Sequence, residues 1–236
     1  MLPSLLKLSS FIIIVFCFGL GIITFYRGSW VTTSTKNNPG QYVVLLHGLR
    51  RSSWSMHILG ANLAKKGYRI INVNYPSTTD TIENLANNYL AKEIERHYLD
   101  KSKQINFVTH SMGGAVVRYF LGEYKFENLN RVVMIAPPSR GAEAADIWSK
   151  DKKMRTKVGP AIDQMTTNMN SLVNQLPPPY YEVGIIAGER DEKVSIENTK
   201  LEGMKDFLLV NSKHTFIMIA TEVIEASARF LQNGKF

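Results

Sequence analysis

Short apolar runs alternate with longer amphipathic stretches along residues 41–236. The short runs are rich in Val, Ile and Leu and end at turn residues, which is typical of buried strands. The longer stretches carry apolar residues at helical spacing. Strands that alternate with helices in this way predict a parallel sheet with helices on both faces, and therefore an α/β fold.

The expected strands and helices follow one another in regular order. The strands are expected at 41–46, 68–73, 105–108, 131–135, 182–187 and 207–210, and the helices at 52–66, 80–99, 112–124 and 215–231. The connection over residues 137–181 is much longer than the others, and long connections are often functional. We expect it to hold short helices that border or cap a site.

The N-terminal region carries a different pattern. Phe11 to Tyr26 is a run of sixteen residues without a charge, flanked by Lys7 and Arg27. A helix that spans a bilayer needs about 17–25 apolar residues, and a secretory signal sequence ends in a small-residue cleavage site. Because no A-x-A pattern follows the run, residues 5–27 predict a transmembrane anchor in preference to a cleaved signal peptide.

These patterns divide the chain into two parts. Residues 1–40 are expected to form the membrane anchor (or signal) and a polar linker, and residues 41–236 one globular domain with 137–181 as an insertion. The basic residues that flank the anchor determine its orientation only weakly. We expect a single-pass protein with its domain on the extracytoplasmic side, or a secreted one if the N-terminus is cleaved.

Charge and cysteine content narrow the possible functions. The net charge is +8, but no nucleic-acid recognition motif accompanies it, so we expect no nucleic-acid partner. Attraction to acidic lipid headgroups explains a scattered basic surface more simply. Cys17 is the single cysteine, which excludes an intramolecular disulfide and a cysteine metal site. We expect no metal and no cofactor.

The strongest chemical motif lies where the third expected strand meets a helix. Residues 108–114 read VTHSMGG, with Ser111 at the turn and Gly113 two positions later. This motif resembles the nucleophile elbow of the α/β-hydrolase family, whose usual form is G-x-S-x-G. Thr109 stands where the family has its first glycine. The alternative is that Ser111 only caps a helix and the glycines aid packing.

The resemblance also implies which residues act as base and acid together with the serine. The family has the chain order Ser, Asp or Glu, then His, and His214 is the one histidine after Ser111. It follows the last expected strand and would act as general base. Asp191, after the fifth strand, is the preferred acid because the family commonly places an aspartate shortly before an apolar residue, and Glu189 is the alternative.

A second motif follows the first expected strand. Residues 47–49 read HGL, which resembles the family's oxyanion-loop motif. Gly48 would let the backbone approach the site, and the N–H groups of Leu49 and Met112 would bind the developing oxyanion. His47 is expected to support the loop rather than to transfer protons.

Together these motifs resemble the small lipase-like and esterase-like members of the family. The resemblance implies a reduced α/β-hydrolase core of about six mostly parallel strands with helices on both faces, and cleavage of carboxylic esters through an acyl-enzyme. The implied substrate is an ester or lipid-like small molecule. Acyl transfer by the same residues is an alternative, and so is a catalytically silent membrane-anchored binding module. The oligomeric state is not predicted.

Overall fold

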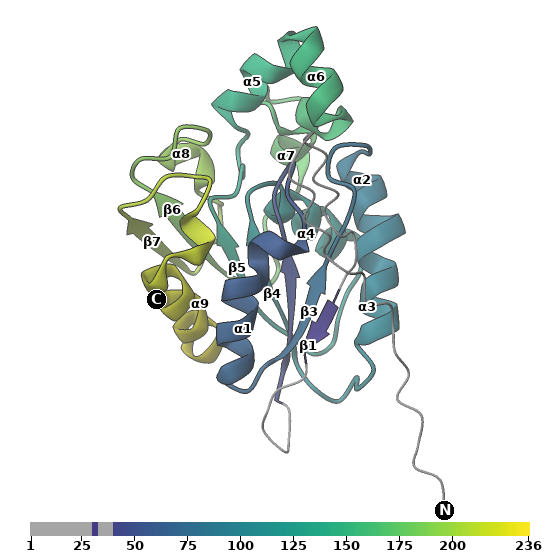
Figure 1. Cartoon of the computed structure of the whole chain (residues 1–236), viewed down its shortest axis with the longest axis vertical. Helices are drawn as coiled ribbons and strands as arrows, with labels where there is room; N and C mark the ends of the chain where they lie inside the picture. The colour runs from purple at the N-terminus through teal and green to yellow at the C-terminus, as the bar shows by residue number, and fades with distance from the viewer. Residues whose placement is uncertain (1–29, 33–39) are drawn as a thin grey trace, which may run out of the picture.

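The computed structural model describes residues 30–32 and 40–236 (Figure 1). The anchor predicted over residues 5–27 lies outside them. Within the described residues a seven-stranded sheet has the order β1-β3-β2-β4-β5-β6-β7. The strands are β1 (Trp30–Thr32), β2 (Tyr42–Leu46), β3 (Arg69–Val73), β4 (Ile105–His110), β5 (Leu129–Ile135), β6 (Glu182–Gly188) and β7 (Asp206–Val210). Strands β2 to β7 are parallel, so the six-stranded parallel sheet predicted from the sequence is confirmed.

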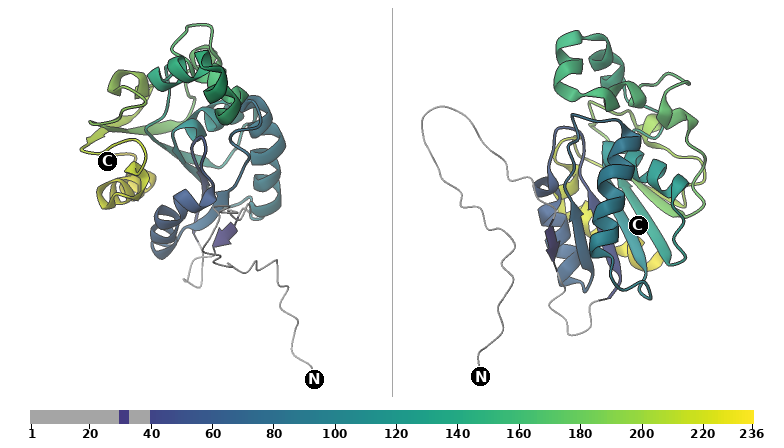
Figure 2. Two further views of the ribbon diagram at one scale, coloured as in Figure 1. Left: turned by 45° about the horizontal axis from the view of Figure 1, so that its top comes forward. Right: turned by 90° about the vertical axis from the view of Figure 1, so that its right-hand side faces the viewer.

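Helices cover both faces of the sheet, because side chains of successive strand residues point to opposite faces. On one face pack η1 (Ser53–Met56), α1 (His57–Lys65), η4 (Ile217–Ile219) and α9 (Thr221–Asn233). On the other pack α2 (Ile82–Asn84), the π-helical segment η2 (Leu85–Leu90), α3 (Ala91–His97) and α4 (Met112–Glu123). Along β2, Val43 and Leu45 belong to the first core, and Val44 and Leu46 to the second. The two layers are visible in Figure 2.

The long connection between β5 and β6 consists of short helices, as expected. They are α5 (Glu143–Lys150), α6 (Lys152–Val158), η3 (Pro160–Met165) and α7 (Leu172–Gln175), and α8 (Ile196–Thr199) follows β6. Figures 1 and 2 show α5 and α6 beyond the carboxyl ends of the parallel strands. In open α/β sheets, ligands bind at this edge.

Three elements differ from the sequence prediction. The final helix was expected over residues 215–231, but α9 begins only at Thr221, and residues 215–220 form the short helix η4 and its flanking turns. The helix expected over 80–99 is divided by η2. Strand β1 was not expected. It pairs antiparallel with β3 and begins with Trp30 opposite Asn72, so the sheet extends beyond residue 41 towards the N-terminus.

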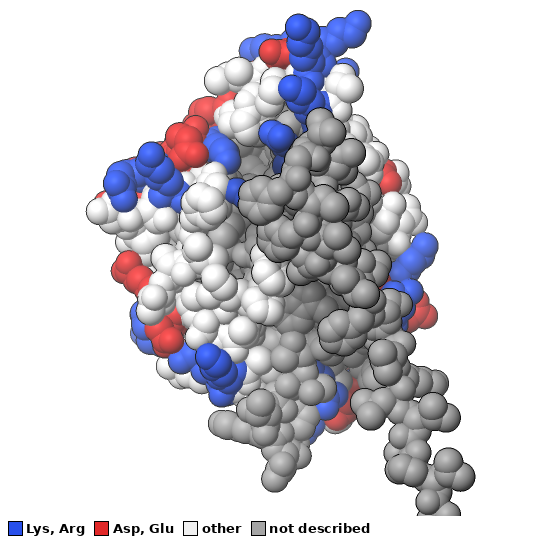
Figure 3. Space-filling view, in the orientation of Figure 1, with Lys and Arg blue, Asp and Glu red and all other residues white. Residues whose placement is uncertain are grey.

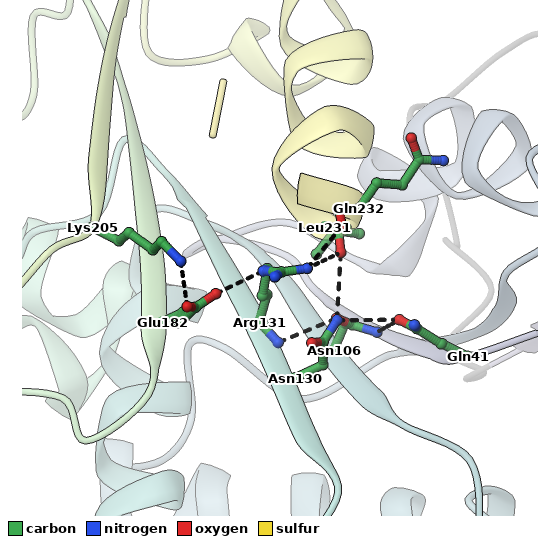
Figure 4. A network of polar contacts seen from close by, with 8 residues as sticks. All are labelled: Gln41, Asn106, Asn130, Arg131, Glu182, Lys205, Leu231 and Gln232. Atoms are coloured by element: carbon green, nitrogen blue, oxygen red, sulfur yellow. Dashed lines mark hydrogen bonds and ion pairs between the residues drawn. The ribbon is translucent and has the colours of Figure 1, made fainter. Parts of the chain in front are cut away.

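A polar network ties α9 to the amino-terminal edge of the sheet (Figure 4). Arg131 donates to the carbonyl oxygens of Leu231 and Gln232, both at 3.0 Å, near the end of α9. Its Nε also donates to Glu182, which Lys205 contacts in turn. Positive charge at a helix carboxyl terminus is stabilising. The network lies at the opposite end of the sheet from Ser111 and is structural.

Candidate active site

Ser111 occupies the turn between β4 and α4 in a strained backbone conformation. Its φ is 52° and its ψ −125°, a region that residues other than glycine rarely adopt. The conformation is held by two hydrogen bonds, from the Ser111 N–H to the Ile135 carbonyl at 2.9 Å and from the Gly114 N–H to the Ser111 carbonyl at 2.8 Å. Such strain costs about 1–3 kcal/mol and persists where surrounding structure imposes it, commonly at functional sites.

The start of α4 packs directly on β2, which explains the small residues of the motif. A Cβ atom on Gly113 would lie 2.8 Å from the carbonyl oxygens of both Leu46 and His47. Thr109, in place of the family's first glycine, is fully buried. A Cβ atom on Gly114 would lie 3.4 Å from the Thr109 Oγ1, so the absence of a side chain at 114 makes room near the threonine.

Ser111, His214 and Asp191 form one chain of hydrogen bonds. The Ser111 Oγ lies 2.9 Å from the His214 Nε2, and the His214 Nδ1 lies 2.7 Å from the Asp191 Oδ2. With the proton on Nδ1, His214 donates to Asp191 and leaves Nε2 free to accept from the serine hydroxyl. The three groups come from the carboxyl ends of different strands, and in this arrangement the serine proton can pass to His214 while Asp191 holds the ring and stabilises its protonated form.

The Asp191 carboxylate is fixed by the loop after β6. Its Oδ1 accepts hydrogen bonds from the N–H groups of Lys193, at 2.8 Å, and Val194, at 3.0 Å. Its side chain is 1% exposed, and that of His214 is 5% exposed. Glu189 is exposed instead. Of the two acids considered from the sequence, the structure brings Asp191 to His214.

The loop after β2 lies against Ser111. A Cβ atom on Gly48 would lie 3.0 Å from the Ser111 Cβ, which explains the glycine. Leu49 lines the cavity beside Ser111. Met112 is the first residue of α4, and the first N–H groups of a helix have no acceptor within the helix. The two residues predicted to supply oxyanion donors therefore flank the serine.

His47 is buried beneath this loop. Its Nδ1 donates to the Gly48 carbonyl at 2.9 Å, and its ring stacks on Tyr75 with ring centres 4.1 Å apart. The Tyr75 hydroxyl donates to the His47 carbonyl. Burial lowers the pKa of His47 to about 4, so the ring is neutral at pH 7. These contacts hold the loop in place.

His110 is a further site residue that sequence reasoning did not assign. Its Nε2 donates to the His214 carbonyl at 3.0 Å, and the two rings lie 5.1 Å apart. Burial lowers the pKa of His110 well below its usual value, which keeps the ring neutral. His110 thus anchors the backbone of His214. Its position next to Ser111 was visible in the sequence, but the partner across 104 residues was not.

A cavity of about 320 Å³ opens beside Ser111 and His214. One wall is apolar and comes largely from the insertion, with Ala145, Trp148, Ile162 and Met165. The other wall carries cationic residues from the loops after β2 and β6, namely Arg50, Arg51 and Lys193. The insertion predicted at 137–181 therefore borders the site.

Within the described residues, no cluster of three or more His, Cys, Asp or Glu side chains could hold a metal ion. Over the same ranges, 30–32 and 40–236, no helix is both long and apolar enough to cross a membrane.

Comparison with known proteins agrees with this architecture. A family model described as the alpha/beta hydrolase fold matches residues 41–157. The lipase BlEst2 from Bacillus licheniformis in its mature form has a TM-score of 0.70 and 16% identity, over 89% of this chain and 99% of the lipase. Est1E from Butyrivibrio proteoclasticus has a TM-score of 0.64 and 19% identity, over 86% and 92%.

The phospholipase PlaB from Legionella pneumophila is also similar in structure, with a TM-score of 0.68 and 16% identity. The similarity covers 82% of this chain and 60% of PlaB, so PlaB contains a large further part. No curated protein sequence matches the chain. The sheet order and the family match together show that the chain has the alpha/beta hydrolase fold, and lipases and esterases are among the solved structures of similar fold.

Proposed function

We propose that this chain is a serine hydrolase that cleaves carboxylic esters through an acyl-enzyme intermediate. The observation that carries the proposal is the hydrogen-bonded chain from Ser111 through His214 to Asp191, at a strained turn beside a partly apolar cavity. Serine nucleophiles require a base within hydrogen-bond reach and a third group that orients it. The lipases and esterases of similar fold support ester substrates in preference to other acyl compounds.

In the proposed mechanism, the Ser111 Oγ attacks the ester carbonyl while its proton passes to the His214 Nε2. Asp191 stabilises the imidazolium that forms, and the N–H groups of Leu49 and Met112 donate to the oxyanion. His214 then protonates the departing alcohol oxygen, and the acyl group remains on Ser111. Water then attacks the acyl-enzyme while His214 takes its proton, and His214 returns that proton to the Ser111 Oγ as the bond to the acyl group breaks and the acid is released.

The full-length chain in a neutral detergent tests this proposal with p-nitrophenyl octanoate. We expect p-nitrophenol release that Ser111→Ala reduces to the background rate. Product analysis with an added alcohol separates hydrolysis from acyl transfer, because transfer produces a new ester in place of octanoic acid. The proposal is wrong if the unaltered chain releases no product, which would favour a catalytically silent binding module.

We further propose that residues 5–27 anchor the protein in a membrane with its domain on the extracytoplasmic side. The uncharged run of sixteen residues supports the anchor. Strand β1 begins with Trp30 opposite Asn72, near the carboxyl end of β3. The chain thus joins the domain at the edge of the sheet that carries Ser111, which suits a substrate drawn from the membrane.

A further inference from the structure

The cavity of the candidate active site is lined by cationic side chains that are not paired with carboxylates. Arg50, Arg51 and Lys193 line the cavity beside Ser111. None of them forms an ion pair with a carboxylate in the described part of the chain. Arg51 instead lies over the ring of Phe216, 5.7 Å from its centre, and the Lys193 Nζ donates to the Thr215 hydroxyl at 3.0 Å.

Most of the carboxylates near the cavity accept hydrogen bonds from other groups. Asp191 is bonded to His214, and Glu143 accepts from the Ser195 N–H at 3.0 Å and from the Asn198 side chain at 2.8 Å. Asp146 accepts from Thr167 through both of its oxygens. Glu192 is exposed. Asp191, Glu143 and Asp146 are therefore held by other partners, and no carboxylate in the described part of the chain forms an ion pair with the cationic wall.

Of the three cations, Lys193 is partly removed from water, whereas Arg50 is exposed. Burial lowers the pKa of Lys193; the charges of Arg51 and Arg50 act in the same direction, and those of Glu192 and Asp191 oppose them. A cation in such surroundings is stabilised by an anion that approaches it, because the attraction is screened less than at an open surface. Figure 3 shows further Lys and Arg atoms at the top of the view, where Figure 1 places α5 and α6.

The same cavity is also lined by apolar side chains, among them Trp148, Ile162 and Met165, which form its apolar wall. We infer that the substrate is an amphiphilic ester whose acyl chain packs against the apolar wall and whose alcohol portion carries an anionic group, such as a phosphate, bound by Arg50, Arg51 and Lys193. This inference rests on the proposed ester hydrolysis and names its substrate class. The cations bind and orient the substrate, and Ser111, which lines the same cavity, attacks the ester carbonyl.

Binding to full-length Ser111→Ala in a neutral detergent tests the inference without turnover. Calorimetric titration compares hexyl phosphate, hexyl glucoside and inorganic phosphate. We expect hexyl phosphate to bind at least about tenfold more tightly than either of the others, because only it engages both walls. Equal affinity for hexyl phosphate and hexyl glucoside would overturn the inference, and so would equal affinity for hexyl phosphate and inorganic phosphate.

Charge variants assign the effect to the cationic wall. Arg51→Gln and Lys193→Gln, each added to Ser111→Ala, are expected to weaken hexyl phosphate binding about tenfold and to leave hexyl glucoside binding unchanged. Arg51→Lys should restore part of the loss. Arg140→Gln removes a charge from an exposed position that does not line the cavity, and should have no effect. An equal loss in Arg140→Gln would contradict a local site.

Turnover separates this inference from the proposed function. With Ser111 intact, kcat/KM is compared for two esters with the same acyl chain, monooctanoylglycerol phosphate and monooctanoylglycerol. Hydrolysis of both at equal rates would leave the proposed function standing and overturn the inference. Hydrolysis of neither, together with no release of p-nitrophenol from p-nitrophenyl octanoate, would refute the proposed function, and the binding titrations would still decide whether the cavity selects anionic amphiphiles.

Discussion

At the scale of single residues, Asp191 and Glu189 differ in what surrounds their carboxylates. The Asp191 side chain is buried and accepts hydrogen bonds from two backbone N–H groups and from His214, whereas Glu189 is exposed. Asp191→Asn should therefore lower kcat for ester hydrolysis by about 10⁴-fold, because an amide favours the wrong tautomer of the histidine. Glu189→Gln, the matched control, should retain kcat within about twofold. A large loss in the control and none in Asp191→Asn would reverse the assignment.

His47 makes the stability of the fold depend on pH. Its pKa is about 4 in the folded chain, because of burial, and about 6.5 when unfolded. As the pH falls from about 6.5 to 4, the unfolded chain binds a proton that the folded chain does not, so the free energy of unfolding decreases. The contribution of His47 to this loss is roughly 3 kcal/mol at pH 4.

Urea unfolding at pH 7, 5.5 and 4.5 measures this effect. His47→Gln should be less stable at pH 7 but should lose less free energy of unfolding on acidification than the unaltered chain. His110 is also buried with a lowered pKa and contributes in the same direction in both proteins. An unchanged pH dependence in His47→Gln would show that the His47 ring is not held neutral by the fold.

At the scale of elements, α4 connects the nucleophile to the insertion through Arg118. This side chain is buried and donates to the carbonyl oxygens of Ser139, at 2.9 Å, Val173, at 3.1 Å, and Leu176, at 3.2 Å. Arg118→Met removes these donors and leaves buried acceptors unsatisfied. We expect it to lower the free energy of unfolding by about 3 kcal/mol and to speed proteolysis within residues 150–181.

Arg96→Met is the matched control for Arg118→Met. Arg96 is 65% exposed and pairs with Glu93 at 2.7 Å, and exposed ion pairs of this kind contribute about 0.3–0.5 kcal/mol. The control should therefore change stability by less than about 0.5 kcal/mol and leave proteolysis of the insertion unchanged. Equal effects of the two substitutions would mean that Arg118 does not hold the insertion.

Among the elements, the parallel strands could be predicted from the sequence, but strand β1 and the start of α9 could not. Most of the parallel strands were predictable because they are largely apolar runs with residues buried on both faces of the sheet, as in β2, β4 and β6. The start of α9 could not be predicted, because residues 215–220 continue the apolar pattern of the helix. In the structure these residues form η4 and the turns that follow His214. Strand β1 has three residues and depends on pairing with β3, so no local pattern marked it.

The site residues could be predicted where their position follows from the order of the strands along the chain. Ser111, Asp191 and His214 each follow a strand, and the carboxyl ends of parallel strands meet at one edge. The contacts of His110 and Arg118 cross long stretches of sequence and required the three-dimensional structure. The same holds for the cationic wall, since Arg51 and Lys193 come from loops after different strands.

At the scale of the whole molecule, exposed apolar side chains lie near the proposed membrane attachment. Trp54, Ile58 and Phe216 are 70%, 47% and 63% exposed and line one hollow near the active-site edge. Arg50 and Arg51 line the same hollow. Aromatic and basic side chains together favour the interface of a membrane with anionic lipids. We therefore expect this face to contact the bilayer when the full chain is anchored.

Fluorescent labels in reconstituted vesicles test this orientation. In a Cys17→Ser background, which removes the native cysteine, Phe216→Cys and Leu99→Cys each carry an environment-sensitive label. Leu99 is 74% exposed and lies between α3 and β4, at the opposite edge of the sheet. Nitroxide lipids should quench the label at position 216 and not that at position 99. Equal quenching at both positions would contradict the orientation.

The central claim is that Ser111 is a nucleophile activated by His214. Its most direct test is the reaction of the full-length chain with a fluorophosphonate probe, followed by mass spectrometry of the labelled peptide. We predict one adduct on Ser111, lost in Ser111→Ala and slowed by at least about 10³-fold in His214→Ala. Labelling that persists in Ser111→Ala, or that proceeds at the same rate in His214→Ala, would contradict the claim.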